Sequence, residues 1–262
     1  MTTRLHADWL VPEWDAPGTG AVMTTRHGGV SAAPFDSLNL RDGLGDDPVA
    51  VAQNQRRLAD AIGAAPVWLK QVHGAGVVQL AERDRQPGAP LHHADASFTV
   101  EPGVVCAVQV ADCLPVLFAA PAARGVAAAH AGWRGLAGGV LEAAIAALCN
   151  AARCEPGELQ AWLGACIGPR RFEVGGDVLG AFGADPDRHA DQPGFAALEP
   201  GSESRKWNAD LPWLARQRLV AAGVQSVNGG TWCTVESPSR FFSFRRDGLT
   251  GRMAAAVWIE RR

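Results

Sequence analysis

The sequence predicts an α/β or α+β domain built in several layers. Many short apolar runs alternate with amphipathic helical segments, and no internal repeat is present. The 262 residues are 47% hydrophobic and 19% charged, which is a globular composition with enough material for a substantial core. We expect a single domain over residues 1–262. The polar, proline-containing stretch 183–206 is interpreted as a long surface loop, because neither flank looks self-sufficient.

The first half of the chain is expected to contain mostly strands. Residues 21–25 form a strand that runs into the glycine-rich turn 27–29. A helix begins at Asp47-Pro48, where an acidic cap precedes a proline whose missing N–H does no harm, and Gly63 ends it. Further strand-like runs follow at 67–69, 77–80, 96–100, 104–110, 114–119 and 125–129.

The second half adds two helices and two strands. The alanine-rich segment 136–150 predicts a helix, and residues 162–164 resemble a strand. Residues 210–222 predict another helix that stops at Gly223, and residues 254–259 suit a final buried strand.

Composition excludes several classes of function. The formal net charge of −3 provides no basic surplus for a nucleic-acid polymer. No apolar run approaches the roughly 20 residues that span a bilayer, and the first ten residues lack the apolar core of a signal peptide. We therefore expect a cytoplasmic protein without a membrane partner. Its six cysteines are then better read as buried thiols or metal ligands than as disulfides.

Three potential metal ligands lie where strand-like runs end. His73 and His130 each close such a run, and Cys113 stands before a proline-marked break. Thiolate and imidazole donors suit zinc in tetrahedral geometry. The alternative is that the cysteine is a small buried hydrophobe and the histidines are ordinary hydrogen-bonded residues, since no spacing rule links the three. The residues alone leave both interpretations open.

Known catalytic signatures are missing around these residues. There is no His-Glu-x-x-His, no deaminase motif with Pro-Cys-x-x-Cys, no Gly-x-Ser-x-Gly and no Walker loop. Seven scattered histidines are too few for the copper centres of a multicopper oxidase.

A series of ordered motifs runs from about residue 20 to the C-terminus. They are TTRHGGVS (24–31), SLNL (37–40), GDDP (45–48), QVHG (71–74), ADA (94–96), ADCLP (111–115), HAGWRG (130–135), IGP (167–169), DL (210–211), CT (233–234), FSFRR (242–246) and TGRM (250–253). Together these motifs resemble the laccase-domain family, also called polyphenol oxidase-like proteins or peptidoglycan editing factors.

The resemblance implies a layered α/β (α+β) fold with mixed sheets flanked by helices, and zinc held by His73, Cys113 and His130. It also implies phosphorolysis of adenosine, inosine and methylthioadenosine to free base and ribose 1-phosphate or its methylthio form, with adenosine deamination as a second activity. The expected partners are small-molecule nucleosides and phosphate, and the expected assembly is a monomer or small homo-oligomer.

The chain departs from the family pattern at a few positions. Phe244 and Phe172 stand where tyrosine is frequent, and Arg170-Arg171 replaces a pair that often contains cysteine. These changes leave the three ligands intact, but they make Cys166 a poor candidate for essential chemistry.

The three ligands are also the expected catalytic residues. Zinc with one thiolate and two imidazoles keeps an open position and can lower the pKa of bound water to about 7. Copper is a less favoured occupant. Substrate contacts are expected from four further side chains, with the two arginines for phosphate and the two amides for base or sugar: Arg26, Asn39, Gln71 and Arg245. Both amides could equally be local turn caps.

Two other functions remain as alternatives. Cys113 could be a nucleophile activated by His130 in a hydrolase that edits peptidoglycan precursors. The protein could also be non-catalytic, with a structural zinc closed by a fourth ligand from Cys106 or His27.

Overall fold

The computed structural model describes residues 5–86, 88–199 and 205–261. In chain order the elements are β1 (Thr19–Met23), α1 (Pro48–Ile62), β2 (Pro66–Val67), β3 (Val77–Gln79), η1 (Glu82–Arg85), β4 (Ala96–Thr99), β5 (Val105–Val110), β6 (Leu114–Ala119), η2 (Pro121–Ala123), β7 (Val126–Ala131), α2 (Trp133–Ala137), α3 (Val140–Ala152), η3 (Pro156–Glu158), β8 (Gln160–Leu163), β9 (Glu173–Val174), α4 (Gly176–Ala181), β10 (Phe195–Ala197), β11 (Trp207–Ala209), α5 (Leu211–Ala221), β12 (Ser226–Gly229), α6 (Phe244–Asp247) and β13 (Met253–Ile259).

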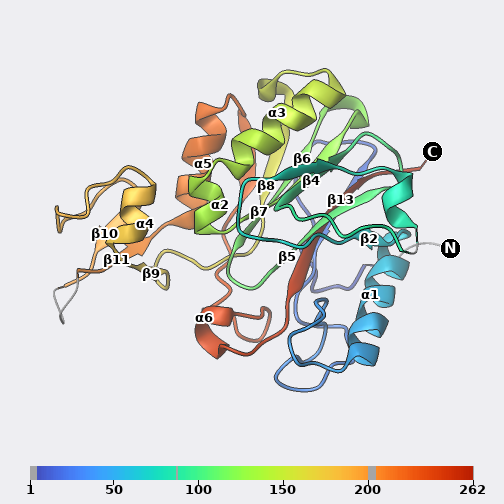
Figure 1. Cartoon of the computed structure of the whole chain (residues 1–262), viewed down its shortest axis with the longest axis horizontal. Coiled ribbons are helices and arrows are strands. Elements are labelled where there is room, and N and C mark those ends of the chain that lie inside the picture. Colours follow the sequence, from blue (N-terminus) through green and yellow to red (C-terminus); the bar gives the residue numbers. More distant parts are fainter. Residues whose placement is uncertain (1–4, 87, 200–204, 262) are drawn as a thin grey trace.

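Two mixed sheets form the centre of the molecule (Figure 1). The six-stranded sheet has the order β12-β8-β6-β7-β4-β3, and the four-stranded sheet has the order β1-β13-β5-β2. Their facing sides share one buried cluster that includes Leu117 and Ala128 from the first sheet and Val108 and Val257 from the second. Strands β5, β6 and β7 are buried along their whole length, which explains why their sequences are apolar apart from Gln109 and His130. The predicted mixed-sheet α/β class is confirmed.

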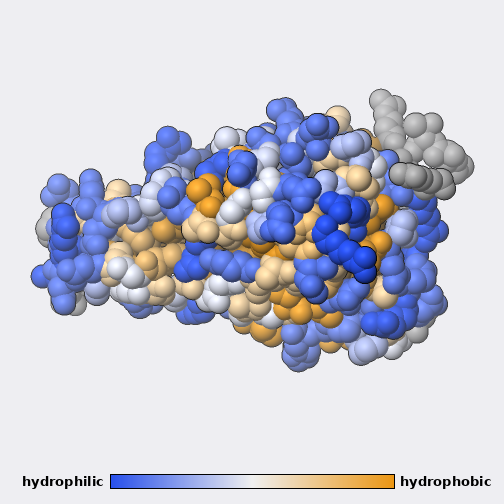
Figure 2. Space-filling model, turned by 90° about the horizontal axis from the view of Figure 1, so that it is seen from above, coloured by the Kyte–Doolittle hydropathy of each residue, from blue (hydrophilic) through white to orange (hydrophobic). Residues whose placement is uncertain are grey.

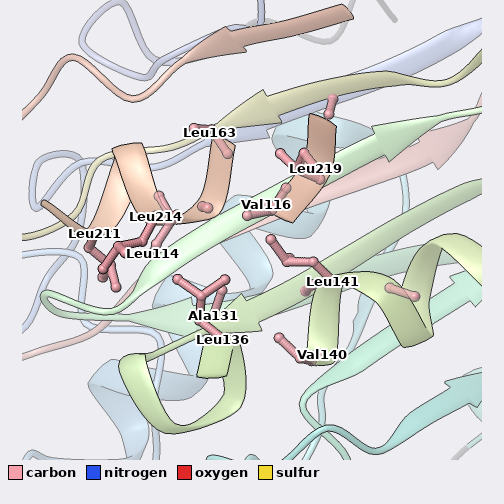
Figure 3. Packing of buried hydrophobic residues seen from close by; sticks show 14 of the residues in the cluster. Leu114, Val116, Ala131, Leu136, Val140, Leu141, Leu163, Leu211, Leu214 and Leu219 are labelled. Carbon is pink, nitrogen blue, oxygen red and sulfur yellow. The ribbon is translucent and has the colours of Figure 1, made fainter. Parts of the chain in front are cut away.

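Helices cover the outer faces of both sheets, which gives four layers. Helix α1 packs Leu58 and Ile62 against the four-stranded sheet. Helices α3 and α5 lie on the six-stranded sheet, where their leucine side chains pack against those of β6 and β8 (Figure 3). The residues that point toward one another there are Leu114, Val116, Ala131, Leu136, Val140, Leu141, Leu163, Leu211, Leu214 and Leu219.

The start and end of α1 follow the predicted signals. The Asp47 side chain accepts a hydrogen bond from the Val49 N–H, Pro48 is the first helical residue, and Gly63 ends the helix at φ 77°. The prediction of a single helix over 136–150 was wrong, because the structure has two helices there. Gly139, at φ 90°, separates α2 from α3, because two adjacent glycines interrupt the helix at 138–139.

A third, smaller sheet of order β10-β11-β9 projects with α4 from one side of the body (Figure 1). It lies between β8 and α5 in the chain. Strand β10 falls inside the stretch 183–206, so that stretch is not entirely the expected surface loop; residues 200–204 lie outside the described part. The short β9, β10 and β11 carry no periodic signal that the sequence could reveal.

The surface seen from above is hydrophilic toward both ends and carries a hydrophobic band across its middle (Figure 2). Among the described residues, no helix combines the length and apolar character that crossing a bilayer requires.

Candidate metal centre

The three predicted ligands come together at one end of the six-stranded sheet. Cys113 directly precedes β6, and His130 lies near the end of its antiparallel neighbour β7, opposite Pro115. His73 reaches the same point from the loop before β3. One donor atom from each residue lies within 4.8 Å of the other two. The two imidazole rings meet edge to face, with centroids 4.8 Å apart.

Asp95 holds both histidines in place. Its Oδ1 accepts hydrogen bonds from His130 Nδ1 and from the His73 N–H, both at 2.9 Å. Its Oδ2 accepts from the Val72 N–H at 3.1 Å and from the Gly74 N–H at 2.7 Å. These bonds stabilise the left-handed backbone of His73, whose φ is 60°. With Nδ1 engaged, Nε2 of His130 is the nitrogen left for a metal.

The electrostatics favour a charged thiolate. Burial alone raises the pKa of Cys113, but His130 and His73 outweigh it and bring that pKa to about 6. Burial alone lowers the pKa of His130, but the Cys113 thiolate and Asp95 raise it to about 9. In metal-free protein at neutral pH the two residues therefore form a thiolate–imidazolium pair.

Gly132 is required by close packing at the centre. A β-carbon on this residue would stand 2.9 Å from Cys113 Sγ and 3.3 Å from His73 Cδ2. Only glycine therefore lets the turn between β7 and α2 pass behind two ligands without moving them.

The fourth ligand that a structural zinc would need does not come from the two expected donors. Within residues 5–86, 88–199 and 205–261, the cluster has three members. Cys106 is fully buried in the core, where burial raises the pKa of its thiol to about 12. His27 bonds Asp8 at 2.9 Å through Nδ1.

A small cavity of about 130 Å³ opens beside Cys113. Its walls are largely apolar and aromatic, formed by Ala111, Asp112, Cys113, Gly132, Trp133, Ile167, Phe172, Leu211, Phe244 and Arg245. Asp112 has a left-handed backbone with φ 92°. Its carboxylate accepts hydrogen bonds from the Thr234 hydroxyl at 2.5 Å and from the Arg245 N–H at 2.6 Å. These bonds fix the residue that precedes the Cys113 ligand.

Of the two arginines expected to contact phosphate, Arg245 lines this cavity. Its guanidinium donates to the Glu173 carbonyl at 3.0 Å and lies 5.4 Å from the centre of the Phe172 ring. Arg26 has other partners. It donates to the carbonyls of Asp36 and Pro238 and forms an ion pair with Asp36 at 3.1 Å.

The side-chain amides of Gln71 and Asn39, which were expected to contact base or sugar, form hydrogen bonds within the protein. Gln71 exchanges two hydrogen bonds with the backbone of Gln109 on β5, at 2.9 and 2.8 Å. The Asn39 amide donates to the Arg41 carbonyl and to Asp46, and its oxygen accepts backbone N–H groups. Their contact with substrate stays a prediction.

The sequence predicted no role for Asp95, Asp112 or Gly132 in supporting the three clustered side chains. Their motifs, ADA, ADCLP and HAGWRG, stood out in the chain, but only the folded geometry shows what these three residues support. The cavity walls at Trp133 and Phe172 come from distant segments, and the sequence did not predict that these two residues would meet.

Known proteins resemble this chain along almost its whole length. The family model described as "Multi-copper polyphenol oxidoreductase laccase" matches residues 20–260. This chain belongs to that family. Among the family's members, a purine nucleoside phosphorylase of Pseudomonas aeruginosa is 49% identical over 254 residues, covering 96% of this chain and 98% of its own length. The Escherichia coli purine nucleoside phosphorylase YfiH is 47% identical over 255 residues, covering 95% and 98%.

Solved structures show the same fold. The crystal structure of a Neisseria meningitidis protein is 43% identical, has a TM-score of 0.85, and aligns over 97% of this chain and 100% of its own. YlmD from Geobacillus stearothermophilus is 33% identical with a TM-score of 0.88, and the match covers 99% of both chains. Although the family description names several coppers, the described residues of this member offer one cluster with three donors.

Proposed function

We propose that the chain is a zinc-dependent purine nucleoside phosphorylase. It converts adenosine, inosine and methylthioadenosine to the free base and ribose 1-phosphate, or its methylthio form, and deaminates adenosine as a second activity. The observation that carries this proposal is a three-donor metal cluster beside an aromatic cavity. The printed names of the Pseudomonas and Escherichia relatives support the reaction class.

We assign zinc to His73, Cys113 and His130, because thiolate and imidazole donors suit this cation in tetrahedral geometry. One thiolate and two imidazoles with a free position are the arrangement of catalytic rather than structural zinc. When bound, the cation supplies Lewis acidity to the reacting centre. Its charge would also replace the proton on His130 in neutralising the Cys113 thiolate.

The chain's own residues supply binding and orientation in this proposal. The Trp133, Phe172 and Phe244 walls give the flat purine an apolar surface. Arg245 offers a cation at the same cavity, and Asp112 holds the Arg245 backbone. The polar groups of Arg26, Asn39 and Gln71 are bonded within the protein and support the surrounding backbone, so a contact of these residues with substrate stays a prediction. The cytoplasmic location is part of the same proposal.

A second candidate rests on the thiolate–imidazolium pair. Such a pair is also the arrangement of a cysteine nucleophile, so a metal-free hydrolase acting on peptidoglycan precursors is the competing function. The two differ in what Cys113→Ser does. If the variant loses turnover but retains full zinc stoichiometry, Cys113 is a nucleophile and the ligand assignment fails.

The deciding experiment incubates metal-analysed, zinc-loaded protein with adenosine, with and without phosphate. Ribose 1-phosphate formed only with phosphate supports phosphorolysis, and inosine formed without phosphate supports deamination. If neither product forms, the nucleoside function is excluded.

A further inference from the structure

Two arginines that are distant in the sequence are tied together beside the metal centre. The side-chain oxygen of Asn39 accepts the Arg252 N–H at 2.9 Å and the Arg41 N–H at 3.1 Å. A backbone bond from the Leu40 N–H to the Arg252 carbonyl, at 3.0 Å, joins the same two segments. One fully buried amide therefore fixes the relative position of the two arginine backbones.

The orientation of this amide is fixed from its other end. Asn39 Nδ2 donates to Asp46 Oδ2 at 2.9 Å and to the Arg41 carbonyl at 3.1 Å. Because Nδ2 has these two acceptors, the oxygen must face the two arginine N–H groups. The Asn39 carbonyl accepts in turn from the buried Asn54 side chain at 2.9 Å.

The two guanidinium groups are not neutralised by carboxylates. Within the described residues, no Asp or Glu forms an ion pair with Arg41 or Arg252, whereas Arg170 and Arg218 each have one. Among the residues that the structure describes, the Arg252 guanidinium donates hydrogen bonds only to the carbonyls of Thr250 and Gly251.

Arg252 lies against a wall of the cavity beside Cys113. The Arg252 guanidinium carbon lies 5.7 Å from the centre of the Phe244 ring, which forms a cavity wall. Burial and the neighbouring Arg41 charge lower the pKa of Arg252, and the opposing effect comes from Cys113 and Asp112. Arg252 thus lies behind the Phe244 wall of the cavity, and Asn39 joins its backbone to that of Arg41.

We propose that Arg41 and Arg252 form a binding site for inorganic phosphate beside the metal centre, with Asn39 as the positioning residue. A phosphate dianion offers several acceptor oxygens to two guanidinium forks and removes their mutual repulsion. Both side chains are partly exposed, so an ion can reach them.

The identity of the anion as a cosubstrate rests on the proposed phosphorylase function. In that reaction a phosphate oxygen forms a bond to the ribose C1′ while the bond from C1′ to the base nitrogen breaks. The base leaves with that electron pair and takes the proton of HPO4²⁻, so ribose 1-phosphate and neutral base are the balanced products.

The test titrates inorganic phosphate into the zinc-loaded protein by calorimetry. We expect Arg41→Gln and Arg252→Gln each to weaken phosphate binding about tenfold or more, since each removes charge-assisted hydrogen bonds. Arg124→Gln is the matched control, because its guanidinium is exposed and paired with Glu158. It loses the same charge and should bind phosphate as the wild type does.

Asn39→Ala tests the positioning role without removing a charge. The affinity for phosphate should fall several-fold and the KM for phosphate should rise several-fold, while the KM for the nucleoside stays close to that of the wild type. Circular dichroism and zinc stoichiometry establish that the variant is folded and loaded.

Phosphate binding that is equal in the wild type and both arginine variants overturns the site, even if phosphorolysis is found. Arginine-dependent phosphate binding upholds the site, even if no nucleoside reacts. If nucleoside 5′-monophosphates bind with this dependence and orthophosphate does not bind, the assignment to inorganic phosphate is overturned.

Discussion

Replacing Asp95 with asparagine should weaken the metal centre without altering any ligand. Each carboxylate oxygen of Asp95 accepts two hydrogen bonds, so four donors converge on one buried side chain. An asparagine keeps one oxygen and presents an NH2 group on the other side. If that NH2 faces His130, the imidazole must accept at Nδ1, and its proton moves to Nε2, the nitrogen needed by the metal.

If the NH2 faces Val72 and Gly74 instead, two backbone N–H groups lose their acceptor. Each lost hydrogen bond to a charged acceptor lowers the free energy of unfolding by about 1.5–3 kcal/mol. The cost is smaller where the loop moves and the N–H group finds water as a new acceptor. In either orientation the support of a metal-binding histidine is damaged. Changes of this kind reduce metal affinity about 10–100-fold, which is about 1.4–2.7 kcal/mol of binding free energy.

Competition with a chromophoric chelator measures the zinc affinity of Asp95→Asn against the wild type. Asp84→Asn is the matched control, because Asp84 also accepts from a histidine, His92, at 2.8 Å and from the Ala81 N–H at 2.8 Å, outside the metal centre. A zinc affinity of Asp95→Asn equal to that of the wild type would refute the role given to Asp95.

Three further predictions follow from the geometry. Without metal, the pKa of Cys113 is about 6 and that of His130 is about 9. Between these pH values zinc binding displaces one proton, so the zinc affinity measured by titration should rise about tenfold per pH unit. Below pH 6 a second proton must leave, and the rise should be steeper. Gly132→Ala should lower zinc occupancy, because the added β-carbon overpacks the centre and destabilises it by about 1–3 kcal/mol. Gly180→Ala is the control, because open space surrounds its β-carbon, and it should keep the zinc occupancy of the wild type in metal analysis. Leu141→Ala should lower the free energy of unfolding by about 2–5 kcal/mol in urea titrations, whereas Val220→Ala on the exposed face of α5 should stay within about 0.5 kcal/mol.

Local sequence patterns predicted the elements whose signals are themselves local. Helix α1 has a cap, a proline and a terminal glycine, and the buried strands β5 to β7 are predominantly apolar runs. The small projecting sheet was missed because strands of two or three residues have no measurable periodicity. The division between α2 and α3 was also missed, although the glycine pair at 138–139 was visible in the sequence.

The three side chains that cluster at the centre were singled out from the sequence, but the residues that hold them in place were not. His73, Cys113 and His130 belong to residue types with distinctive metal chemistry, although His73 lies in the loop before β3 and not at the expected strand end. Asp95 acts through backbone N–H groups and one ring nitrogen, and Asn39 joins two segments from opposite ends of the chain. Such roles depend on tertiary contacts, which no spacing in the sequence encodes.

The projecting sheet leaves and rejoins the body of the protein at the cavity wall. Phe172 immediately precedes it, Leu211 follows it closely, and both residues line the cavity. The intervening segment could therefore be shortened or exchanged for that of a relative while the metal ligands, which come from other strands, keep their framework. Its two junctions are natural graft points for redesigning what the cavity accepts, with the metal chemistry left in place.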